Sequence, residues 1–207
     1  MKISPTLTEV KKIAKTGKYD ILPVSCEILS DFITPIEAMR ILQNVSTHCY
    51  LLESAQANEA WGRYTFLGYD PKLEINCIDG HMKLGKLSVE TENPSEYIRQ
   101  ILSEYKSPKF DYLPSFTGGL VGYFSYDYLG YKEKSIRGKA RDTEDFKDVD
   151  LMLFDKVIAF DNLCQKIILI ANMSLDAPET GYNKAIVELK QLRELLMHGE
   201  KKKNMGG

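Results

Sequence analysis

The feature that most constrains the fold is a pair of apolar runs near the end of the chain, separated by a short turn. Residues 150–160 (DLMLFDKVIAF) and 166–173 (KIILIANM) are rich in β-branched and aliphatic side chains, which favour strands. Asp161 and Asn162 begin the connection between them. Two strands joined by so short a connection pair as an antiparallel hairpin, so the sequence predicts an antiparallel sheet rather than a parallel one.

A second hairpin is predicted over residues 72–89. Residues 72–79 alternate Leu73, Ile75 and Cys77 with polar side chains, and residues 81–89 return after the two-residue turn Asp79-Gly80. Because residues 50–68 also contain two strand-like runs, we expect one continuous antiparallel meander over residues 50–89. A further strand is predicted at residues 19–29, at a sheet edge or with a bulge, because Pro23 cannot donate a ladder hydrogen bond.

Four helices are predicted from apolar residues spaced three or four apart, over residues 6–15, 34–43, 93–105 and 182–197. The second begins most clearly, because a capping Thr34 precedes Pro35 and Glu37 completes a capping box. These elements predict an α+β fold with a twisted, largely antiparallel sheet and helices packed on one side. We expect one domain over residues 1–199, a linker at 106–114 and a disordered tail at 200–207.

The composition argues against several classes of function. The chain has 207 residues, 27% of them charged, with a formal net charge of −2, and this balance predicts neither a nucleic-acid nor a membrane partner. No apolar run approaches the length of a membrane span, and no signal peptide is recognisable. Free buried thiols and a cytoplasmic location are expected from four cysteines without CxxC spacing: Cys26, Cys49, Cys77 and Cys164.

The chain offers few residues for catalysis. It contains no GxSxG or HExxH motif and no recognisable serine–histidine–acid arrangement, so we predict no catalytic residue in it. The three histidines are not spaced as metal ligands with one another or with a cysteine, so no metal site and no cofactor are predicted. The glycines around residue 119 lack the lysine and hydroxyl residue of a phosphate-binding loop and are interpreted as part of a buried strand.

The best candidate site lies in residues 48–71 (HCYLLESAQANEAWGRYTFLGYDP). An apolar run ends on Glu53 and Ser54, and the next run is preceded by Arg63. A half-buried carboxylate needs a cationic partner, which the ammonium group of a ligand would supply, while Arg63 could hold the ligand's carboxylate. These side chains predict a pocket for a small zwitterion with an apolar body. A solvated strand end, or an internal Glu53–Arg63 ion pair that clamps the hairpin, explains the same residues without a ligand.

Three segments in order, LLES at residue 51, WGRYTFLGYDP at residue 61 and GGLVGYFSYD at residue 118, resemble the amino-terminal region of anthranilate synthase component I. The resemblance extends over most of the chain and includes the helix TPIEAMRIL. It implies the α+β fold of the anthranilate and aminodeoxychorismate synthase large subunits. In that family LLES lies in the site for feedback inhibition by L-tryptophan, which implies a tryptophan-binding role for Leu52, Glu53, Ser54 and, with a less regular spacing, Arg63.

The resemblance also implies what the whole enzyme does. Its full-length members convert chorismate and glutamine-derived ammonia to anthranilate and pyruvate, with Mg²⁺ in a carboxy-terminal catalytic domain and with a glutamine amidotransferase subunit as partner. Nothing in these 207 residues resembles that catalytic domain, so we expect a regulatory region that is inactive by itself, and whether the chain is an enzyme stays open. An apolar surface left by the missing domain predicts a homodimer.

Two other readings remain at this stage. One is the corresponding region of aminodeoxychorismate synthase, which shares the architecture. The other is a stand-alone amino-acid-binding module without a catalytic partner, for which tight tryptophan binding by the isolated chain is expected.

Overall fold

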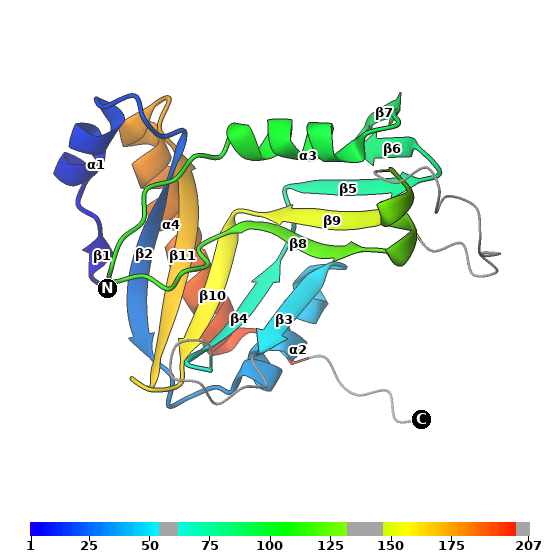
Figure 1. Cartoon of the computed structure of the whole chain (residues 1–207). Helices are drawn as coiled ribbons and strands as arrows, with labels where there is room; N and C mark the ends of the chain where they lie inside the picture. Colours follow the sequence, from blue (N-terminus) through cyan, green and yellow to red (C-terminus); the bar gives the residue numbers. More distant parts are fainter. Residues whose placement is uncertain (54–61, 132–146, 202–207) are drawn as a thin grey trace, which may run out of the picture. The chain divides into compact units, whose positions relative to one another are not determined.

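The computed structural model describes residues 1–53, 62–131 and 147–201 (Figure 1). The chain divides into two compact units. The first contains the described parts of 1–70, 105–118 and 155–207, and the second those of 71–104 and 119–154. The region predicted as one domain, residues 1–199, therefore contributes to both units. None of the helices in these described ranges is long and apolar enough to span a membrane.

The first unit contains a six-stranded antiparallel sheet in the order β1-β2-β11-β10-β4-β3. Its strands are β1 (Ile3–Ser4), β2 (Ile21–Leu29), β3 (Cys49–Glu53), β4 (Tyr64–Tyr69), β10 (Lys156–Asp161) and β11 (Lys166–Ser174). The predicted hairpin is confirmed in β10 and β11, which pair from Lys156↔Ala171 to Asp161↔Lys166. Strand β1 pairs only with Ser25 and Cys26 of β2. On the β1 side of β2, Pro23 therefore has no strand partner that would need its N–H.

Helices α1 (Leu7–Ala14), α2 (Pro35–Val45) and α4 (Pro178–His198) cover one face of this sheet (Figure 1). The capping box predicted for α2 is present, because Thr34 and Glu37 each hydrogen bond the other's backbone N–H. The helices and the sheet share one buried core, which includes Val10, Leu22, Val24, Ala38, Leu42, Leu67, Ile158, Phe160, Leu169, Leu189 and Leu192. The predicted packing of helices on one side of an antiparallel sheet is thus confirmed.

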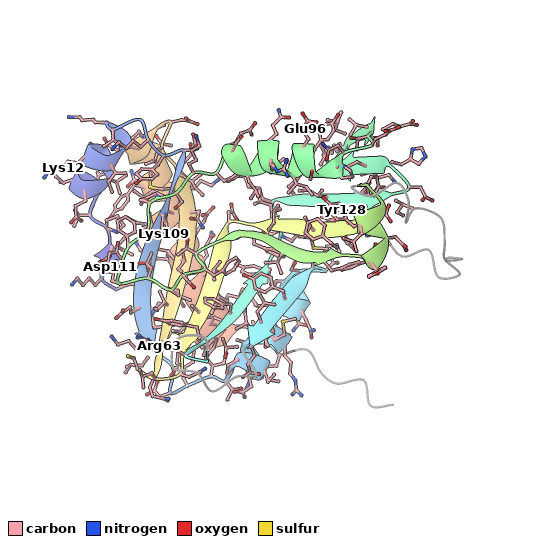
Figure 2. The ribbon with its side chains drawn as sticks, viewed as in Figure 1. Lys12, Arg63, Glu96, Lys109, Asp111 and Tyr128 are labelled. Carbon is pink, nitrogen blue, oxygen red and sulfur yellow. The ribbon has the colours of Figure 1, made fainter. Side chains whose placement is uncertain are left out.

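The opposite face of the six-stranded sheet is covered by the connection 105–118, on which Figure 2 labels Lys109 and Asp111. Residues 106–114 were predicted as a linker, but Leu113 is buried against Val157 and Ile170, and Phe110 packs on the same cluster. Phe116, three residues after Leu113, packs on the cluster as well. The prediction of a linker is therefore wrong, because the apolar side chains of this connection complete a second core.

The second unit contains a five-stranded antiparallel sheet in the order β7-β6-β5-β9-β8. Its strands are β5 (Leu73–Ile78), β6 (His81–Leu84), β7 (Leu87–Glu90), β8 (Gly119–Phe124) and β9 (Val149–Phe154). Helix α3 (Pro94–Ser103) packs on one face, where Ile98 joins Ile75, Met82 and Leu151 in the core. A 3-10 helix, η1 (Tyr126–Tyr131), follows β8.

Two predicted continuities are wrong. Strands β4 and β5 belong to different sheets, so residues 50–89 do not form one meander; the chain leaves β4 through Asp70, whose φ is +53°, and Pro71. The run 150–160 is also divided, at Asp155, into β9 and β10. The burial pattern gives the reason, since β9 is buried mainly on alternate residues whereas β10 is buried on both faces from Val157 onward.

The break at Asp155 is stabilised by Asn172 of β11. The backbone N–H of Asn172 donates to the Asp155 carbonyl at 2.9 Å, and the side-chain amide donates to the same oxygen at 2.9 Å. That amide also donates to the Thr117 carbonyl at 2.7 Å. The Asn172 side chain therefore satisfies two backbone carbonyls. One is at Thr117, just before β8, and the other is at Asp155, between β9 and β10.

Candidate functional site

The predicted ligand residues Leu52 and Glu53 end β3, one of the two edge strands of the six-stranded sheet. In the hairpin, Leu52 pairs with Phe66 and Glu53 with Thr65. The Leu52 side chain remains 45% exposed although it belongs to a strand, and Glu53 is exposed as well. Ser54 lies outside the described residues. The structure therefore places two of the four predicted residues together where β3 ends, on the side of the hairpin from which the chain continues to β4.

Strand alternation puts the two side chains on opposite faces of the sheet. Cys49 and Leu51 pack against the core beneath the helices, so Glu53 continues that face. Leu52 continues the other face, which it shares with Tyr50 and its cross-strand neighbour Phe66. A ligand that touches both Leu52 and the Glu53 carboxylate must therefore wrap around the end of the strand.

The face shared by Leu52 carries an aromatic cluster. Phe116, from the connection 105–118, meets Phe66 edge to face at 5.5 Å between ring centroids and Tyr50 at 6.4 Å. The ring centroids of Tyr64 and Phe66 lie 5.8 Å apart. Edge-to-face pairs of this kind are favoured by the ring quadrupoles and hold the rings in fixed positions. The cluster gives Leu52 a rigid apolar neighbourhood, suited to the body of an aromatic ligand.

Gly68 makes room for one of these rings. Tyr50 is paired with Gly68 in the hairpin, and a Cβ atom added to Gly68 would lie 2.2 Å from Cε1 of Tyr50. The ring of Tyr50 thus packs directly on the glycine backbone of β4. Burial raises the pKa of the Tyr50 phenol, so the group is neutral at physiological pH.

Arg63, the fourth predicted residue, forms a bidentate ion pair with Asp161 at the end of β10 (Arg63 is labelled in Figure 2). Nε lies 3.0 Å from Oδ1 and Nη2 lies 2.6 Å from Oδ2. Asp161 is only 3% exposed, and its Oδ1 also accepts the backbone N–H groups of Leu163 and Cys164. The Arg63 hydrogen bonds hold the pKa of the Asp161 carboxyl at about 2, below its usual value of 3.8.

The alternative of an internal Glu53–Arg63 ion pair is not what the described residues show. Within the described part of the chain, the carboxylate that binds Arg63 is Asp161, 98 residues further along, and not Glu53. The guanidinium also lies 5.0 Å from the centre of the Tyr64 ring. Among the described residues its hydrogen bonds use Nε and Nη2, so Nη1 is the atom from which Arg63 could still bind a ligand. The sequence analysis placed Asp161 only at the start of the turn after its strand; the β4–β10 pairing brings it next to Arg63.

The cysteines and acids do not assemble a metal site in the described ranges. No group of three or more His, Cys, Asp or Glu side chains there is placed to hold a metal ion. Burial raises the pKa of the Cys26 thiol to about 11, and burial also raises the pKa of the Cys77 thiol. Cys164 is exposed, and its sulfur accepts a hydrogen bond from Arg63 at 3.4 Å.

The chain is similar over most of its length to large subunits of anthranilate synthase. Curated proteins named anthranilate synthase component 1 match it, from Acetivibrio thermocellus at 34% identity and from Pseudomonas aeruginosa at 35%. These matches cover 93% and 91% of this chain and 39% of each relative. An anthranilate synthase alpha subunit 2, chloroplastic, from Oryza sativa subsp. japonica is 34% identical over 80% of the chain. No family model matches.

A solved structure agrees with these matches. The crystal structure of anthranilate synthase component I from Streptococcus pneumoniae TIGR4 superposes with a TM-score of 0.51 at 25% identity, over 80% of this chain and 36% of that one. The resemblance to the amino-terminal region of anthranilate synthase component I, and the fold that it implies, are therefore confirmed. The chain spans about two fifths of the length of the curated relatives it matches.

Proposed function

We propose that this chain is the tryptophan-sensing region of an anthranilate synthase large subunit. The proposal rests on Leu52 and Glu53, which end an outer strand beside a rigid aromatic cluster, in a chain similar to these enzymes over nine tenths of its length. L-tryptophan combines an ammonium group, a carboxylate and a flat apolar ring. The end of β3 and Arg63, which precedes β4, together offer a partner for each of these groups.

Each proposed residue contacts a different group of the ligand. The Glu53 carboxylate binds the ammonium group, and the Ser54 hydroxyl supplies a second polar contact. Leu52 and the Phe66–Phe116 pair contact the indole ring. Arg63 contributes through Nη1 alone, since Nε and Nη2 hydrogen bond Asp161. Because Leu52 and Glu53 lie on opposite faces, the ammonium and the ring occupy opposite sides of the strand end.

The whole protein of which this region is part converts chorismate and ammonia to anthranilate, pyruvate and water. Its ammonia comes from a glutamine amidotransferase subunit, and its Mg²⁺ binds outside the residues described here. Tryptophan acts as a feedback inhibitor by binding one arrangement of the complete enzyme more tightly than another, and it shifts the equilibrium only by that difference in affinity. The cytoplasmic location expected from the sequence belongs to the same proposal.

The test combines binding with turnover. We expect L-tryptophan to shift the NMR signals of Leu52 and of the Phe66–Phe116 cluster, with a Kd of about 1 mM or weaker, since Leu52 and Glu53 are exposed to solvent. Glu53→Gln should abolish these shifts, while Glu90→Gln, an exposed acid at the end of β7, should leave them unchanged. No shift at these residues with tryptophan at several times that concentration would contradict the proposed site.

Two further outcomes are decisive. Formation of anthranilate from chorismate and ammonium by the purified 207-residue chain, followed by its fluorescence, would contradict the regulatory assignment. Micromolar tryptophan binding by the same chain would instead support a stand-alone amino-acid-binding module.

A further inference from the structure

A pocket of about 340 Å³ lies in the first unit, away from the end of β3. Its walls come from the start of the chain around β1, from helix α1 and from the connection 105–118. All of the residues that line it belong to the first unit. The volume is in the lower part of the range for pockets that hold small molecules, so the pocket suits a ligand of one ring.

Two stacked aromatic rings form one wall of this pocket. Phe110 and Tyr112 lie on the connection 105–118, with 5.1 Å between their ring centroids and 23° between their planes. Phe110 is held in place because it packs on both cores of the first unit. Tyr112 remains 47% exposed although it stacks on Phe110. A partly exposed ring on a fixed support offers a surface on which another flat ring can stack.

Helix α1 adds one carboxylate and one ammonium group to the pocket lining. Glu9 and Lys12 are three residues apart, so their side chains lie on the same side of the helix (Figure 2 labels Lys12). Oε2 of Glu9 accepts the backbone N–H and the hydroxyl of Thr6, both at 2.7 Å. These bonds fix the carboxylate and leave Oε1 for a cation. Within the described ranges, the Lys12 ammonium has neither a hydrogen bond nor an ion pair.

The rest of the lining is fixed and largely apolar. Pro5 is buried, and its carbonyl accepts a hydrogen bond from the Tyr182 hydroxyl at 2.9 Å. Ile13 contributes an aliphatic side chain from α1. Burial raises the pKa of the Tyr112 phenol to about 12, and the Glu9 carboxylate adds to this shift. The phenol is therefore protonated at physiological pH and can donate a hydrogen bond to a ligand.

We propose that this pocket binds a free α-amino acid with a single aromatic ring, such as L-phenylalanine. The ammonium group pairs with Glu9, the carboxylate pairs with Lys12, and the ring stacks on Tyr112. The lining carries one charge of each sign, so a ligand with only a carboxylate or only an amine would pair with one of them. This pocket shares no residue with the end of β3, so the proposal is independent of tryptophan binding there.

The test titrates the chain with L-phenylalanine and follows the NMR signals of the Tyr112 ring and the Ile13 methyl groups. Both should shift because of the ligand's ring current, with a Kd of about 1 mM, as suits a small pocket. Two matched ligands separate the contacts. 3-Phenylpropanoate lacks the ammonium group and L-cyclohexylalanine lacks the flat ring, so each should bind about fivefold more weakly or worse.

Variants identify the residues that bind. Lys12→Gln should weaken L-phenylalanine binding about fivefold or more. The matched control is Lys15→Gln, an exposed lysine at the end of α1 outside the pocket lining, and it should leave the Kd within about twofold. Tyr112→Leu keeps an apolar side chain but removes the stacking ring. It should abolish the preference for L-phenylalanine over L-cyclohexylalanine.

Several results would overturn the proposal. Equal Kd values of L-phenylalanine and L-cyclohexylalanine for the wild-type chain would do so, and this comparison does not require any variant to fold. Equal effects of Lys12→Gln and Lys15→Gln would also do so, as would the absence of shifts at Tyr112 and Ile13 with about 10 mM L-phenylalanine. Shifts confined to Leu52 would place L-phenylalanine at the end of β3 instead.

Discussion

The Arg63–Asp161 ion pair should stabilise the first unit measurably, and Asp161→Asn tests this. Asp161 is nearly fully buried, so its charge is compensated mainly by Arg63 and by two backbone N–H groups. The pKa of its carboxyl falls from 3.8 to about 2 on folding. Since one pKa unit corresponds to about 1.4 kcal/mol, the ionised form contributes about 2 kcal/mol to the free energy of unfolding. We expect the variant to lose about that amount at pH 7.

The pH dependence gives a sharper check than the size of the loss. Because the folded-state pKa of Asp161 is depressed, its contribution is fully present above the unfolded value of 3.8 and is lost as the pH falls toward about 2. The difference between wild type and Asp161→Asn should therefore stay constant from pH 7 to about pH 4 and then shrink. Urea unfolding followed by circular dichroism at a series of pH values measures this difference.

The control is an exposed ion pair of similar length. Glu27 and Lys166 lie 2.9 Å apart, but both side chains are largely solvated, so Glu27→Gln should cost clearly less stability than Asp161→Asn. A double-variant cycle with Arg63→Gln isolates the pair itself, since the second substitution should cost little once the first is present. The reasoning would be refuted if Asp161→Asn cost no more than Glu27→Gln, or if its cost did not change below pH 4.

Three further predictions concern local features. Gly68→Ala should destabilise the chain by about 1–3 kcal/mol in urea unfolding, because its Cβ collides with the Tyr50 ring; a neutral result would mean that the ring moves freely. Cys164 should react first with a thiol reagent and Cys26 only on unfolding, as mass spectrometry of labelled peptides can show; equal rates would contradict the burial that raises the Cys26 pKa. Thr34→Ala should cost about 1 kcal/mol by removing the cap of α2, and an unchanged melting temperature would argue against the capping box.

Some of the candidate site was predictable from the sequence and some was not. LLES at a strand end, with the next strand starting near Arg63, was predicted from two apolar runs and is what the structure shows for the described residues. The aromatic cluster was not predicted, because Phe116 lies 50 residues from Phe66 and no local pattern relates them. The same holds for Asp161, which is distant in sequence but next to Arg63 through strand pairing.

The sequence by itself determined local structure. The start of α2, the β10–β11 hairpin and the strand at LLES depend on side chains within a few residues of one another, where caps, turns and alternation act. The tertiary structure alone decided where strand partners change. The breaks at Asp70 and Asp155 divide runs that look continuous, because each strand's place depends on which faces distant segments bury. It also decided that Arg63 binds Asp161, an ion pair that only the adjacency of β4 and β10 creates.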